Sequence, residues 1–109
     1  MSTPATSSTA PRLSERQKRH LRGLAHALGP IVRIGHAGAS AAVVSELARA
    51  LHDHELVKVK VPGGDREGRA QLIAQLAEGS GSALVQRIGN VALFYRPRED
   101  SPRILIPEA

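Results

Sequence analysis

The chain has 109 residues, of which 41 % are hydrophobic, and this suits a single domain whose core is built from aliphatic side chains. It has no cysteine, which excludes disulfides and thiolate metal sites, and no apolar run approaches the ~20 residues that span a bilayer. The formal net charge is +5, and residues 12–35 account for all of it with six basic side chains and one acidic side chain. Such a basic segment attracts phosphate polymers, although a solvated helix face would have the same composition.

Residues 1–11 carry no charged side chain and six hydroxyl groups, and they predict a disordered N-terminal tail. A short targeting peptide, poor in acidic residues and rich in Ser and Thr, is the alternative. The tail lacks the apolar stretch of a secretory signal, and the absence of cysteine fits a reducing compartment. We therefore expect a cytoplasmic protein that has no membrane partner.

Residues 14–28 have the pattern of an amphipathic helix. Ser14 and Gln17 match the capping box that starts a helix, and Gly29 with Pro30 ends it. The predicted buried side consists of residues at helical spacing, namely Leu21, Leu24, Ala25 and Leu28. The opposite side is basic and carries Arg16, Arg19, Arg22 and His26.

The next segments predict a strand at residues 31–34, a turn at residues 35–38 and a helix that Ser40 can cap. The buried side of this helix is predicted at Val44, Leu47, Ala48 and Leu51. Residues 56–61 alternate between apolar and polar side chains and predict a second strand, which Pro62 and the following glycines end.

Asp65 can cap a third helix, whose buried side is predicted at Leu72, Ile73, Leu76 and Ala77. Residues 84–88 and 91–95 flank Gly89 and Asn90, and glycine at the first central position suits a type II′ turn, so we predict a β-hairpin. Residues 98–109 predict an irregular C-terminal extension, whose apolar residues can dock at a place that the sequence does not define.

These elements predict a compact α/β domain at residues 12–97, with three helices and a four-stranded sheet in the order α-β-α-β-α-β-β. Strands that are joined through helices favour parallel pairing, whereas the hairpin is antiparallel. The sheet is therefore expected to be mixed.

The turn at residues 35–38 is the first candidate binding site, formed by Gly35, His36, Ala37 and Gly38. Glycines leave the backbone bare, so that N–H groups can bind a phosphate, and the following helix N-terminus favours an anion. A purely structural strand-to-helix turn would have the same spacing. Arg33 and the basic first helix adjoin the turn in sequence, so we expect the turn and these guanidinium groups to meet as one anion-binding site.

Catalytic and metal sites are weakly supported. Residues 52–55 (HDHE) contain metal-ligand types, but they end a helix and enter a strand, so their side chains should diverge. A nuclease based on His20, His26 or His36 would have few carboxylate partners, because Glu15 is the only acidic residue in the basic segment. We expect a non-enzymatic protein with no metal, no cofactor and no small-molecule substrate.

Phe94 and Tyr95 are the only aromatic residues, and adjacent positions of a strand point to opposite faces of a sheet. At least one of them should therefore serve the core. Proteins that bind single-stranded RNA stack the bases on aromatic side chains. Because Arg, Lys and backbone N–H groups bind phosphates instead, the composition favours folded RNA over a base-specific single strand.

These segments resemble the CRM domain family (chloroplast RNA splicing and ribosome maturation), and in particular its bacterial single-domain form. The resemblance covers residues 13–97, with its parts in the family's order and spacing. Its parts are LS (13–14), QK (17–18), HL (20–21), GLAH (23–26), Pro30, Val32, GHAG (35–38), HELVKVK (54–60), DRE (65–67) and YRP (95–97).

The resemblance implies a fold similar to the C-terminal domain of translation initiation factor three. It implies RNA binding through the 35–38 loop and nearby basic residues, which here would be Lys18, Arg22, Lys58, Lys60 and Arg96. For the bacterial form it implies association with ribosomal RNA in the precursor of the large ribosomal subunit, as a ribosome assembly factor. We expect a monomer. The alternative is a protein-interaction module whose basic face binds an acidic protein.

Overall fold

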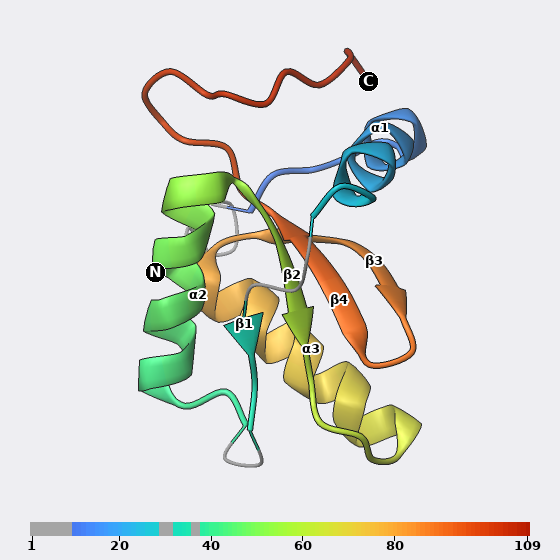
Figure 1. The fold of residues 1–109 in the computed structure, drawn as a ribbon, viewed down its shortest axis with the longest axis vertical. Coiled ribbons are helices and arrows are strands. Elements are labelled where there is room, and N and C mark those ends of the chain that lie inside the picture. The colour runs from blue at the N-terminus through green and yellow to red at the C-terminus, as the bar shows by residue number, and fades with distance from the viewer. Residues whose placement is uncertain (1–9, 29–31, 36–37) are drawn as a thin grey trace, which may run out of the picture.

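The computed structural model describes residues 10–28, 32–35 and 38–109. Three helices and four strands follow the predicted order (Figure 1): α1 (Glu15–Ala25), β1 (Val32–Arg33), α2 (Ala41–His54), β2 (Leu56–Lys60), α3 (Arg66–Ser80), β3 (Ala83–Ile88) and β4 (Val91–Tyr95). The strands form one sheet in the spatial order β1-β2-β4-β3. The β1–β2 pair is parallel and the other two pairs are antiparallel, which confirms the predicted mixed α/β sheet.

Local sequence signals explain where the helices begin. Ser14 and Gln17 form the predicted capping box, and the side chains of Ser40 and Asp65 cap α2 and α3. The first helix ends at Ala25, three residues before the predicted limit. The hairpin turn has Gly89 at φ 59°, the left-handed conformation that a type II′ turn needs at its first central position.

Helices α2 and α3 cover one face of the sheet along its whole length (Figure 1). The main core lies between them, and its largest fully buried side chain is Phe94. The strand residues that point to this face include Val57, Val59 and Val61, as the alternation predicted.

Helix α1 covers only one end of the other face of the sheet (Figure 1). Leu21 and Ala25 are buried there against Tyr95 and its neighbours, in a second core. Leu24, which the helical spacing placed on the buried side, is 41 % exposed, so that prediction was wrong. The helix is short and crosses only the edge of the sheet face, which leaves too little surface to bury a third position.

The C-terminal extension has no helix or strand, and it docks beside α1. Ile104 and Ile106 pack against the second core, and the Gln17 side chain donates to the carbonyl of Pro107 at 2.9 Å. Residues 98–109 therefore complete the cover of this end of the sheet.

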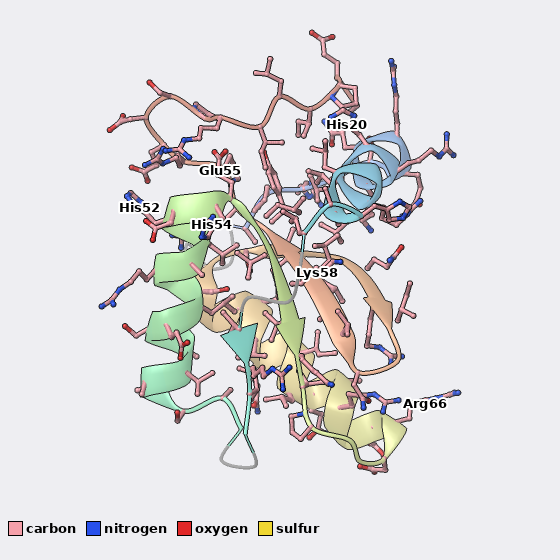
Figure 2. All side chains as sticks on the ribbon, in the orientation of Figure 1. His20, His52, His54, Glu55, Lys58 and Arg66 are labelled. Carbon is pink, nitrogen blue, oxygen red and sulfur yellow. The ribbon has the colours of Figure 1, made fainter. Side chains whose placement is uncertain are left out.

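Glu55 holds the extension in place from the C-terminal end of α2 (Figure 2). Its carboxylate is fully buried and accepts hydrogen bonds from the backbone N–H groups of Arg98, Arg103 and Ile104, at 2.8, 2.9 and 2.9 Å. Burial alone would raise the pKa of Glu55, but these three bonds and the charge of Arg98 outweigh it and lower the pKa below its usual value. The carboxylate is therefore ionised and structural at neutral pH.

Candidate nucleic-acid interface

The predicted site residues lie at two ends of one sheet face and do not form a single cluster. Helix α1 covers the end at Leu56, whereas β1 leads to Gly35 at the opposite end of the sheet (Figure 1). From Leu56 to Lys60 strand β2 rises by about 13 Å. The expectation that the 35–38 turn and the arginines of α1 meet as one anion-binding site was therefore wrong. The two elements separate because α1 packs over Leu56 and Tyr95, whereas β1 pairs with β2 at Val59 and Lys60.

The open end of this face presents one row of side chains across all four strands. Arg33 pairs with Lys60, Lys60 pairs with Val91, and Val91 pairs with Ile88 in the sheet register. Directly opposed residues point to the same face, so the row has a cationic half and an apolar half. Arg33 and Lys60 are exposed, Val91 is half-buried and Ile88 is 67 % exposed. We call these four residues the open row.

Side chains on this face become more exposed with distance from α1 toward the open row. Leu56 and its register partner Tyr95 are both 2 % exposed beneath α1. Lys58 lies one step further along the same face and is half-buried. Its Nζ donates to the carbonyl of Leu28 at 2.7 Å, so this predicted site residue also ties the chain after α1 to the sheet.

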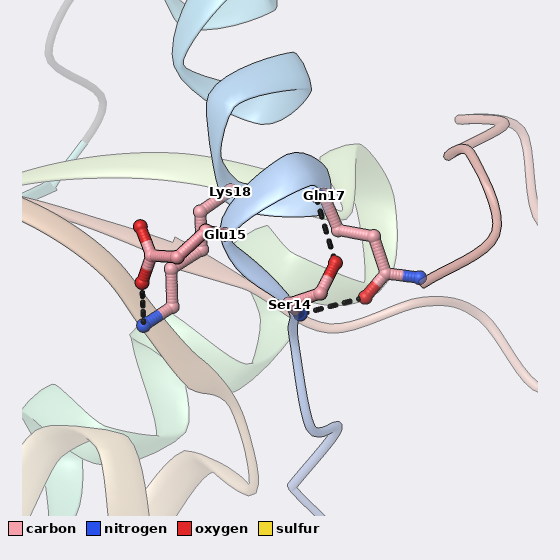
Figure 3. Close-up of polar contacts among 4 residues, drawn as sticks. All are labelled: Ser14, Glu15, Gln17 and Lys18. Carbon is pink, nitrogen blue, oxygen red and sulfur yellow. Dashed lines mark hydrogen bonds and ion pairs between the residues drawn. The ribbon is translucent and has the colours of Figure 1, made fainter.

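Helix α1 borders the open part of the face with basic side chains. Lys18 and Gln17 project from opposite sides of the helix (Figure 3), and Gln17 is on the side of the C-terminal extension. Lys18 and Arg22, one turn apart, therefore lie on the flank of α1 away from the C-terminal extension. Both are half-buried, whereas Arg16, Arg19 and His26 are exposed.

The single ion pair on this surface is weak. Lys18 Nζ lies 3.9 Å from Glu15 Oε2, and the Glu15 side chain is 81 % exposed. It is the only ion pair found in the described part of the chain. An exposed pair at this distance contributes little and leaves Lys18 available to a stronger anion.

The glycine turn lies at the edge where β1 ends and α2 begins. Gly38 has φ 76°, a conformation that favours glycine, and its N–H donates to the Gly35 carbonyl at 3.2 Å. Gly35 is exposed, and a Cβ added there would meet no atom within 4 Å, so packing does not require glycine at that position. The predicted contacts of His36 and Ala37 lie outside the described residues.

Arg96 is engaged within the fold at the other end of the molecule. Its guanidinium nitrogens donate to the carbonyls of Ser80 at 2.6 Å and Ala48 at 3.3 Å, and so they join the C-terminal part of α3 to α2. This residue connects the helices on the far face of the sheet, away from the open row. The geometry gives Arg96 a structural role, and the RNA contact that the resemblance implies stays a prediction.

Three basic residues at the same end of the sheet as the open row were not among the predicted site residues. Parallel strands β1 and β2 end at the same edge of the sheet, which brings Arg66 at the start of α3 to the end that holds the glycine turn (Figures 1 and 2). Arg69 and Arg87 hold the hairpin tip, donating to Asn90 Oδ1 at 3.0 Å and to the Gly89 carbonyl at 3.3 Å. The sequence did contain a signal for Arg66. Two strand-to-helix turns were predicted, and parallel strands place such turns at the same edge of the sheet.

Acidic side chains gather at the opposite end of the molecule. Glu78, Glu99 and Asp100 line a cavity of about 970 Å³ together with Arg96 and Arg98. Acidic side chains also occur at the end that holds the glycine turn, where Asp65 and Glu67 flank Arg66 at the start of α3.

A model of the CRS1 / YhbY (CRM) domain matches residues 13–96. The chain belongs to the CRM domain family. This CRM domain is 43 % identical over 95 residues to a protein of Haemophilus influenzae named RNA-binding protein, with 87 % of this chain and 95 % of that protein covered. It is 37 % identical to the probable RNA-binding protein YqeI of Bacillus subtilis, with 87 % and 99 % covered.

A solved structure has the same fold. The solution structure of a Staphylococcus aureus protein, described as a candidate RNA-binding protein, matches this CRM domain with a TM-score of 0.75 and 34 % sequence identity. The match covers 88 % of this chain and 100 % of the other. None of the names of these three relatives describes an enzyme.

Both aromatic side chains of the CRM domain are buried. Phe94 lies in the main core and Tyr95 in the second core, so neither ring offers a surface for stacking an RNA base. Burial and the negative charge of Glu55 together raise the pKa of Tyr95.

The HDHE segment does not form a cluster in this CRM domain. Glu55 is buried on the C-terminal extension, while His52, Asp53 and His54 are exposed (Figure 2). Within residues 10–28, 32–35 and 38–109, no three His, Asp or Glu side chains come together as metal ligands do. In those same ranges, no helix has the length and apolarity needed to cross a membrane.

Proposed function

We propose that this CRM domain binds folded RNA as a non-enzymatic protein, through the sheet face that α1 leaves open. The open row supports this proposal most directly, because it places two exposed cations, Arg33 and Lys60, beside the glycine turn on a surface with no acidic neighbour in the sheet register. Lys18 and Arg22 add charge at the other border of the same face. The names of the relatives agree with RNA as the ligand.

We further propose that the target is ribosomal RNA in the precursor of the large ribosomal subunit, which the protein meets in the cytoplasm as an assembly factor. The resemblance to the bacterial single-domain form supports this target.

The first test compares two variants with the same change in charge. Arg33→Glu with Lys60→Glu reverses both cations of the open row. Arg49→Glu with Arg103→Glu reverses two exposed cations elsewhere, on α2 and on the C-terminal extension. The open-row variant should lose at least tenfold in affinity for precursor ribosomal RNA, and its salt slope should fall by about 1.4–1.8, as expected for two lost phosphate contacts. The control variant should lose less than about threefold. Equal losses in the two variants would contradict the proposed surface.

The target is tested in cells by crosslinking the protein to RNA and sequencing the attached fragments. Fragments from precursors of large-subunit RNA are expected. Recovery of an acidic protein that stays bound after nuclease treatment, with no enriched RNA, would instead support the protein-interaction alternative.

A further inference from the structure

We propose that the open row binds the minor groove of an A-form RNA duplex, with its cations on phosphates and with Ile88 and Val91 against the ribose edges. This inference rests on the proposed function and specifies the RNA class. The observation behind it is the composition of the row, which changes from two cations on β1 and β2 to two aliphatic residues on β4 and β3.

Ile88 is the part of the row that the fold does not use. It is 67 % exposed, although its neighbour Arg87 and the turn residue Asn90 are held by hydrogen bonds at the hairpin tip. A single exposed isoleucine is common on protein surfaces. This isoleucine is held on a strand. It pairs with Val91, which in turn pairs with Lys60, so the row can offer an apolar contact and a phosphate contact side by side.

The arrangement of cations favours a ligand with two phosphate backbones over a ligand with one. Lys18 and Arg22 border the face at α1, and Arg33 and Lys60 lie at its far end, with the half-buried Lys58 between them. A duplex carries a phosphate run on each side of its minor groove, so both borders can bind at once. Proteins that bind unpaired strands commonly stack the bases on Phe, Tyr or Trp, whereas this chain has no Trp and its Phe94 and Tyr95 are both buried.

The breadth of the row favours the minor groove of RNA over the minor groove of DNA. Four strands at the usual sheet spacing span about 14 Å. The minor groove of B-DNA is about 6 Å wide and cannot admit such a surface. The minor groove of A-form RNA is wide and shallow, and it presents ribose groups that aliphatic side chains can contact.

The inference is tested by measuring affinity for three nucleic acids of matched sequence: an RNA duplex of about 20 base pairs, the corresponding DNA duplex and the single RNA strand. The RNA duplex should bind at least tenfold more tightly than either of the others. Ile88→Ser should weaken duplex binding by about tenfold while leaving the salt slope unchanged, because it removes an apolar contact and no charge. Leu105→Ser is the matched control, since Leu105 is 80 % exposed on the C-terminal extension, and it should leave affinity unchanged.

The outcomes separate this inference from the proposed function. If the single strand or the DNA duplex binds as tightly as the RNA duplex, or if Ile88→Ser binds normally, the duplex inference is overturned while RNA binding stands. If no form of RNA binds even at low salt, the proposed function fails as well.

Discussion

The end of the sheet beneath α1 and the open end are built from the same strands, yet they differ in composition and cover. On β2 and β4 the covered end supplies Leu56 and Tyr95, both 2 % exposed, whereas the open end supplies Lys60 and Val91. Side chains at both ends point to the same face. The difference shows that α1 and the C-terminal extension cover and stabilise one half of the face and leave the other half uncovered.

The largest expected effect is a difference in stability between substitutions at the two ends. Leu21→Ala at the covered end removes a fully buried side chain and should lower the free energy of unfolding by about 3 kcal/mol. Ile88→Ala at the open end should change it by less than about 0.5 kcal/mol. Urea unfolding measures both values. Similar losses for the two variants would mean that the open row is part of the core.

A slightly smaller loss is expected when the anchor of the C-terminal extension is weakened. Glu55→Gln keeps the side-chain volume but removes the charge that three backbone N–H groups share. We expect a loss of about 2 kcal/mol and faster proteolysis of residues 98–109. An unchanged cleavage pattern would mean that Ile104 and Ile106 hold the extension without the carboxylate.

The same carboxylate predicts a dependence of stability on pH. The pKa of Glu55 is lower in the folded protein than its usual value of 4.5, so the folded state binds fewer protons than the unfolded state. The stabilisation is fully present above pH 4.5 and is lost as the pH falls toward the folded pKa. The unfolding free energy of Glu55→Gln should fall less steeply than that of the wild type over this range.

Arg96→Ala tests whether the residue serves the fold or the RNA. It removes the hydrogen bonds to the carbonyls of Ser80 and Ala48, and the expected loss is about 1.5 kcal/mol. RNA affinity, measured well below the melting temperature, should stay within about twofold of the wild type. A loss of affinity as large as that of the open-row variant would restore Arg96 to the binding surface.

The smallest expected effect concerns the border between the covered and open parts. Lys58→Met keeps the aliphatic stem and removes one hydrogen bond to Leu28, at a cost of about 1 kcal/mol. If Lys58 also binds a phosphate, the salt slope should fall by about 0.7–0.9. An unchanged slope would place the limit of the RNA surface between Lys58 and Lys60.

Local patterns predicted the elements well because they depend on neighbours in sequence. The capping box at Ser14, the caps at Ser40 and Asp65, and the Gly89 turn are all satisfied within a few residues. The alternation of Val57, Val59 and Val61 likewise predicted the face that α2 and α3 cover. Leu24 was placed wrongly because burial depends on how much surface α1 meets, which periodicity does not contain.

The candidate site was predicted only in part. Arg33, Lys60 and the glycine turn were identified as basic or phosphate-binding candidates, and the structure brings them to one edge. Arg66 was missed, because charge was summed along the chain and not in space. The structural role of Arg96 was not predicted, because its partners Ser80 and Ala48 are 16 and 48 residues away in the sequence.

By itself, the sequence determined the order of elements, the caps, the mixed sheet, the resemblance to the CRM domain family and the exclusion of cysteine chemistry. Only the tertiary structure decided that the basic helix and the glycine turn stand at opposite ends of one face. It also decided that one residue from each of the four strands joins a row with a cationic half and an aliphatic half. The hydrogen bonds by which the buried Glu55 holds the C-terminal extension were likewise decided by the tertiary structure. Hydrogen bonds within a turn or cap involve residues a few positions apart, so their signals are local. Register, cover and burial depend on segments far apart in the chain, and the packing of the whole domain decides them.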